Sequence, residues 1–96
     1  MLKTTEFSLP KAIFDDKRLT PSDITILSYL YSNIEKKKNY SSVSYTDISQ
    51  GTSISRPTVS KALKNLEKTG WVKIIRKKKD NNQYLLNIPK EVKNND

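Results

Sequence analysis

The 96-residue sequence contains no cysteine and no histidine. Without cysteine, the chain has no disulfide, no thiolate metal site and no cysteine nucleophile. Without histidine, it lacks the commonest general base and the commonest ligand of zinc and copper. Asp15-Asp16 is the only pair of adjacent acids, and no glycine-rich phosphate loop accompanies it. We therefore expect no enzymatic activity, no cofactor and no metal.

Long apolar runs are missing as well. No run exceeds three residues, whereas a transmembrane helix needs about 20 apolar residues and the core of a signal peptide about 7–15. We therefore expect neither a membrane span nor a secretory leader, and we place the protein in the cytoplasm. Its length fits one small domain with a single core.

Positive charge is concentrated in one quarter of the chain. The net charge is +8, from 18 basic and 10 acidic residues. Half of the basic residues lie between Arg56 and Lys79, where Glu67 is the only acid, and the rest of the sequence is neutral overall. A cluster of this kind favours a polyanion such as nucleic acid as the partner; the alternative is a solvated face that serves solubility.

The first part of the chain predicts one helix after a less regular segment. We expect residues 1–19 to be partly ordered, with a short helix over residues 11–15. Thr20 as N-cap, followed by proline in the first turn, then begins a helix. Its apolar residues recur at intervals of three and four up to Ile34. We expect this helix to end near residues 35–37, in a polar, lysine-rich loop.

A second and a third helix follow, with a short turn between them. Ser44 and Asp47 form a capping box for the second helix. We expect it to stop at Gly51, because glycine adopts positive φ without steric cost. The third helix begins after a serine N-cap, spans residues 56–69 and ends at Gly70. About four residues separate the two helices, which is the length of the turn in a helix-turn-helix.

After the third helix the apolar spacing changes from helical to alternating. Residues 71–76 and 83–88 are rich in β-branched and aromatic side chains and predict a hairpin with a charged tip. Trp71 stands at the junction of helix and hairpin, where we expect it to pack in the core. Pro89 closes the second strand because it cannot donate to a ladder. We expect residues 90–96 to form a disordered tail.

Roughly residues 20–88 resemble the winged helix-turn-helix family of DNA-binding domains, and residues 44–72 look like the core pattern of that family. Three motifs carry the resemblance: a Ser-Arg-x-Thr-Val start at residues 55–59, an Ala-Leu-x-x-Leu helix at residues 62–66 and a Gly-aromatic-Val junction at residues 70–72. The resemblance implies an α+β fold, a small winged helix-turn-helix with three main helices and a C-terminal two-stranded wing. This DNA-binding domain is expected to occupy residues 20–89.

Two N-terminal stretches, Phe7-Ser8-Leu9-Pro10 and Leu19-Thr20, are similar to the N-terminal domains of plasmid and phage replication proteins. The sequence has no segment that matches the further domain of such initiators. It also has none that matches the ligand-binding or metal-sensing extensions of repressors with this fold. This disfavours regulation by a small molecule or a metal ion.

The resemblance implies a DNA-binding surface made of a recognition helix, residues 56–69, and a basic wing, residues 71–88. A helix fits the major groove of B-DNA, and its N-terminal residues reach base edges first. Arg56 is suited to bidentate bonds with guanine, and the wing cations suit a minor groove or its phosphates. The candidate DNA-binding residues are Ser55, Arg56, Thr58, Ser60, Lys61, Lys64, Lys68, Arg76, Lys77, Lys78 and Lys79.

Some of these residues also have a structural interpretation. Thr58 can serve the turn that begins the third helix, and Arg56 can be a surface residue beside an N-cap. For the whole chain, the favoured function is sequence-specific binding of double-stranded DNA. The role is that of a transcriptional regulator, or of an accessory factor at a plasmid or mobile-element origin of replication or conjugative transfer.

A second class of function stays open beside DNA binding. Winged helices also serve as protein–protein interaction modules, which dock through the apolar face of the first helix or through the N-terminal segment. For a DNA-binding protein, two assemblies stay open as well: a homodimer on inverted half-sites, or monomers that bind cooperatively on direct repeats.

Overall fold

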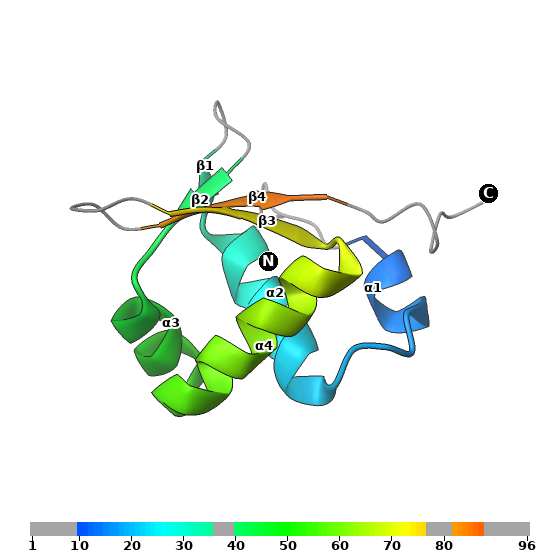
Figure 1. Ribbon diagram of the computed structural model, residues 1–96, viewed down its shortest axis with the longest axis horizontal. Helices are drawn as coiled ribbons and strands as arrows, with labels where there is room; N and C mark the ends of the chain where they lie inside the picture. The colour runs from blue at the N-terminus through cyan, green and yellow to red at the C-terminus, as the bar shows by residue number, and fades with distance from the viewer. Residues whose placement is uncertain (1–9, 36–39, 77–81, 88–96) are drawn as a thin grey trace, which may run out of the picture.

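A computed structural model of the protein describes residues 10–35, 40–76 and 82–87. In chain order its elements are α1 (Ala12–Asp15), α2 (Pro21–Ser32), β1 (Ile34–Glu35), β2 (Tyr40–Ser42), α3 (Tyr45–Thr52), α4 (Arg56–Thr69), β3 (Val72–Ile75) and β4 (Gln83–Leu86). The strands form one antiparallel sheet in the order β1-β2-β4-β3. The helices α2, α3 and α4 lie together on one side of this sheet (Figure 1).

Two capping boxes begin helices where the sequence predicts them. At α2, Thr20 Oγ1 accepts a bond from the backbone N–H of Asp23 (3.1 Å), and the Asp23 carboxylate accepts one from the N–H of Thr20 (2.9 Å). At α3, Ser44 and Asp47 make the same two bonds at 3.0 and 3.1 Å. Each box satisfies backbone donors at the helix start, so both starts are fixed by nearby residues.

The end of α2 lies earlier than predicted. The helix stops at Ser32 because Asn33 caps its last turn, with Nδ2 donating to the carbonyl of Tyr29 (2.9 Å). Ile34 then belongs to β1 rather than to the apolar stripe of the helix. The prediction of a helix end at residues 35–37 is therefore wrong.

The sheet is larger than the predicted two-stranded wing. β2 pairs with β4, with Ser41 opposite Tyr84, and β1 pairs with β2. Ser41 is fully buried, and its hydroxyl donates to the carbonyl of Asn33 (3.3 Å). This hydrogen bond lets a polar residue occupy the centre of a strand that shows no apolar alternation. The wing hairpin is thereby joined to the body of the protein through β2.

The core lies between the sheet and the helices. The apolar stripes of α2 and α4 pack against each other, and the buried residues of α1 join them. The packed core thus includes residues that precede position 20. Its fully buried large side chains are Ile13, Ile26, Leu27, Leu30, Ile48, Val59, Leu63, Leu66, Trp71 and Tyr84.

Gly51 lies inside α3, so the prediction that it ends the helix is wrong. The helix continues to Thr52, and the positive φ falls on Ser53 (61°). A Cβ atom at position 51 would overlap the ring of Tyr29 on α2. The glycine is therefore required by the close approach of α2 and α3, and not by backbone conformation.

Gly51→Ala is expected to lower the free energy of unfolding by about 1–2 kcal/mol, because overlap with Tyr29 outweighs the gain of alanine over glycine within a helix. In a Tyr29→Ala background the overlap is absent, and the same substitution is expected to stabilise the protein by about 1 kcal/mol. Urea unfolding of the four proteins measures both effects. Stabilisation by Gly51→Ala in the unsubstituted protein would contradict this explanation.

Candidate nucleic-acid interface

A short turn joins α3 to α4 and completes a helix-turn-helix. Ser53 adopts a left-handed conformation (φ 61°, ψ 30°) at the end of α3. Ser49 Oγ donates to the carbonyl of Ile54 (2.6 Å), which ties the turn back to α3. These contacts determine how the start of α4 projects from the rest of the fold.

The outer side of α4 carries three exposed lysines, Lys61, Lys64 and Lys68, which we call the lysine row. Their spacing of three and four residues places them on one face of the helix. The opposite face is buried in the core. Among the described residues, the ion pairs link Arg18 with Asp16 and Arg76 with Glu67. The lysine row therefore has no acidic partner within this part of the chain.

At the start of α4, Arg56 is exposed, whereas two neighbouring hydroxyl groups bond to each other. Ser55 Oγ donates to Thr58 Oγ1 (3.0 Å). Ser55 is the N-cap residue by its extended backbone, but its side chain makes no capping bond to the helix. Thr58 and Ser60 are half-buried. The structure thus gives Ser55 and Thr58 a role in the shape of the turn and leaves Arg56 facing solvent.

Arg76 follows β3 and lies against α4. Its Nη2 is 3.3 Å from Oε1 of Glu67, and its Nη1 is 3.4 Å from Oε2. This interaction raises the pKa of Arg76 above its ordinary value. The other predicted wing contacts, Lys77, Lys78 and Lys79, lie outside the described residues.

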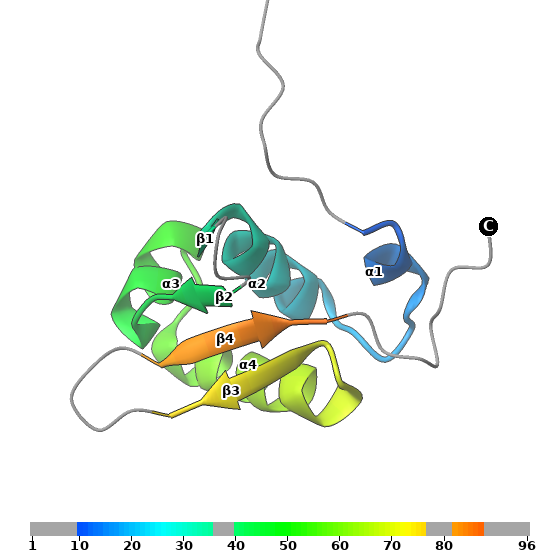
Figure 2. The same ribbon diagram turned by 90° about the horizontal axis from the view of Figure 1, so that it is seen from above.

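The helix α4 and the strand β3 are neighbours in the fold. Figure 2 shows α4 and the edge strand β3 along one side of the molecule, opposite β1 and α2. The pair formed by Arg76 and Glu67 bridges these two elements. A cation of the wing is thereby held beside the helix that carries the lysine row.

A buried network fixes the junction between α4 and β3. Trp71 is fully buried, as predicted, and its Nε1 donates to Oδ2 of Asp16 (2.7 Å). Arg18 Nη2 donates to the same carboxylate (2.7 Å) and to the carbonyl of Thr69 (3.4 Å). The Arg18 guanidinium holds the pKa of Asp16 well below its usual range, against burial, which raises it. Asp16 is thus an anchor for the base of the wing.

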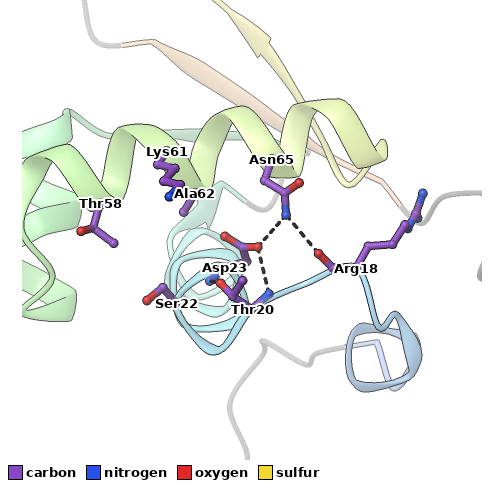
Figure 3. A pocket seen from close by; sticks show the side chains of 8 residues that line it. All are labelled: Arg18, Thr20, Ser22, Asp23, Thr58, Lys61, Ala62 and Asn65. Carbon is purple, nitrogen blue, oxygen red and sulfur yellow. Dashed lines mark hydrogen bonds between the residues drawn. The ribbon is translucent and has the colours of Figure 1, made fainter.

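The side chain of Asn65 on α4 forms hydrogen bonds to the start of α2 and to the residues before it (Figure 3). Its Nδ2 donates to Oδ2 of Asp23 (2.6 Å) and to the carbonyl of Arg18 (3.2 Å). These groups line a groove between the two helices, which Thr58 and Lys61 also border. Local patterns give no signal for the contact between Asn65 and Asp23, because 42 residues separate them.

The described part of the chain offers neither a group of metal ligands nor a membrane-spanning helix. No three of its His, Cys, Asp or Glu residues are grouped so that they could hold a metal ion. None of its helices is both long and apolar enough to span a bilayer.

The sequence model of the MarR family matches residues 19–80, more than half of the chain, from the residue before the α2 cap to five residues beyond the end of β3. The chain belongs to the MarR family. MarR proteins have a winged-helix fold and are DNA-binding regulators. The predictions of a winged helix-turn-helix and of a DNA-binding domain are thereby confirmed.

A solved structure described as the N-terminal domain of a DNA binding protein shares the fold of this MarR-family chain. The TM-score is 0.61, the sequence identity is 20%, and the match covers 88% of this chain and 76% of the other. At this identity the likeness concerns the fold alone. No curated protein matches the chain.

Proposed function

We propose that this MarR-family chain binds double-stranded DNA sequence-specifically, with α4 in the major groove and the wing beside it. The observation that carries the proposal is the lysine row. One face of α4 is fixed in the core, and the other presents exposed cations without an acidic partner among the described residues. The major groove, about 12 Å wide, admits such a helix.

Different residues of the surface are assigned different contacts. Arg56 is exposed at the start of α4, where a side chain first reaches a base edge, so we assign it to reading guanine. The lysine row and Arg76 are assigned to phosphates, which fix register and orientation without reading sequence. Lys77, Lys78 and Lys79 are proposed to extend these phosphate contacts along the wing.

The proposed biological role is transcriptional regulation by occupation of a DNA site. Membership of a family of regulators supports this role. Action at a plasmid or mobile-element origin of replication or conjugative transfer requires the same binding step, and the genomic position of the bound site distinguishes these roles. A homodimer predicts inverted half-sites, whereas cooperative monomers predict direct repeats.

An observation in the core disfavours the alternative of a protein–protein interaction module. Such a module was expected to dock through the apolar face of the first helix or through the N-terminal segment, and the observation concerns the first of these two routes. In α2 this face is occupied by the protein's own core, because Ile26, Leu27 and Leu30 are fully buried. The exposed cations of α4 offer a surface suited to DNA instead.

Selection of bound sequences from a random duplex pool tests the proposal. Arg56→Ala is expected to remove the preference at one guanine, with discrimination there reduced by about 1–3 kcal/mol. Lys11→Ala removes the same charge from an exposed position before α1 and is expected to leave the selected motif unchanged. If Arg56→Ala selects the original motif, the base-reading assignment of α4 is wrong and the wing becomes the candidate reader.

A further inference from the structure

A single acid interrupts the basic stretch, and it is paired with the wing. Glu67 lies on α4 between Lys64 and Lys68 and contacts Arg76 at 3.3 and 3.4 Å. Two nitrogens of the guanidinium meet the two oxygens of the carboxylate. Arginine binds phosphate through the same fork of N–H groups. Glu67 and a DNA phosphate therefore compete for the same edge of Arg76.

The pair is exposed and can be exchanged. The side chain of Arg76 is 59% exposed and that of Glu67 is 38% exposed. Both contacts are longer than the usual charge-assisted hydrogen bond of about 2.7–2.9 Å. Exposed ion pairs contribute little to the stability of a fold. A carboxylate within a basic surface also weakens the attraction of that surface for phosphates.

We propose that Glu67 competes with DNA phosphate for Arg76 and thereby limits how tightly the wing binds duplex DNA. The inference rests on the proposed function and concerns the tuning of the same surface. In the free protein the carboxylate of Glu67 is paired with the guanidinium of Arg76. In the complex a phosphate replaces it, so each binding event first breaks the contact between helix and wing. Glu67 acts through Arg76 and makes no contact with DNA of its own.

Glu67→Gln tests this competition, because it removes the charge and keeps the size of the side chain. The variant is expected to bind a duplex about three- to tenfold more tightly at roughly 0.1 M salt, and the plot of log K against log salt is expected to steepen by about 1. The gain must depend on Arg76. In an Arg76→Gln background, Glu67→Gln is expected to change affinity by about twofold at most, because only screened charge effects remain.

Asp15→Asn is the matched control. It removes one negative charge from an exposed position on α1, and it is expected to change duplex affinity by less than about twofold. Circular dichroism and thermal unfolding of every variant verify that the proteins compared are folded.

Two results would contradict the proposal that Glu67 competes with phosphate for Arg76. An equal gain from Glu67→Gln with and without Arg76 would mean that the carboxylate acts only as a general charge. Unchanged or weaker binding by Glu67→Gln would mean that the pair does not restrain Arg76. Failure of the proposed function itself is distinguishable, because the unsubstituted protein would then select no common motif from the random duplex pool.

Discussion

Replacement of Lys64 and Lys68 by glutamine is expected to weaken duplex binding roughly fiftyfold at about 0.1 M salt. Both side chains are exposed, lie one turn apart on α4, and have no acidic partner among the described residues. Each contact between a lysine and a phosphate releases counterions from the DNA. Loss of two contacts is therefore expected to make the slope of log K against log salt less negative by about 2.

Titration of a labelled duplex at several salt concentrations measures this slope. If six to eight phosphates are neutralised in all, the unsubstituted protein has a slope of about −5 to −7. Replacement of Lys11 and Lys17 by glutamine removes the same charge from exposed positions on either side of α1, outside α4. This control variant is expected to retain most of the affinity of the unsubstituted protein for the duplex. Equal losses in the two double variants would show that net charge, and not its position on α4, governs binding.

Asp16→Asn is expected to lower the free energy of unfolding by about 2–4 kcal/mol. The buried carboxylate accepts bonds from the Trp71 indole and the Arg18 guanidinium. An amide is neutral and can accept through only one oxygen, so the interaction with the guanidinium is weakened and at least one bond is lost. Urea unfolding monitored by the fluorescence of Trp71 measures the change.

The contribution of Asp16 to stability also depends on pH, with a definite sign. Because Arg18 lowers the pKa of Asp16 in the folded state, the folded protein binds fewer protons than the unfolded chain near the ordinary pKa of about 3.9. The contribution is therefore present above this pH and is lost as pH falls below it. Between about pH 5 and pH 2, the unsubstituted protein is expected to lose more stability than Asp16→Asn. Asp15→Asn, at the neighbouring exposed acid, is the control. A parallel loss in the unsubstituted protein and Asp16→Asn would contradict the role of Arg18.

Elements with strong local signals were predictable from the sequence. The capping boxes at Thr20 and Ser44 begin α2 and α3, and Gly70 ends α4 with φ 92°. The periodic stripes of α2 and α4 identify the faces that enter the core. For the candidate site, the same periodicity places the lysine row outside, because the apolar residues of α4 occupy the opposite face.

Features that depend on distant residues were not predictable in this way. β1 and β2 have two and three residues, too few for a periodic pattern. β2 is stabilised by pairing with β4, and β1 by pairing with β2. At position 51 a larger side chain would overlap the ring of Tyr29, which lies on another helix. The bond between Trp71 and Asp16 spans 55 residues. At Ser55, local capping signals predicted the correct residue, and the bond between the hydroxyl groups of Ser55 and Thr58 agrees with the structural interpretation of Thr58, but the capping bond from the Ser55 side chain to the helix backbone is absent.

The pairing of β2 with β4 affects how the chain folds. β2 precedes both helices of the helix-turn-helix and β4 follows them, so their ladder closes a loop of about forty residues. Closing such a loop has an entropic cost that local contacts do not offset until both helices are packed inside it. We therefore expect α4 and the β3–β4 hairpin to fold together in one cooperative step, and a fragment cut between them to retain neither.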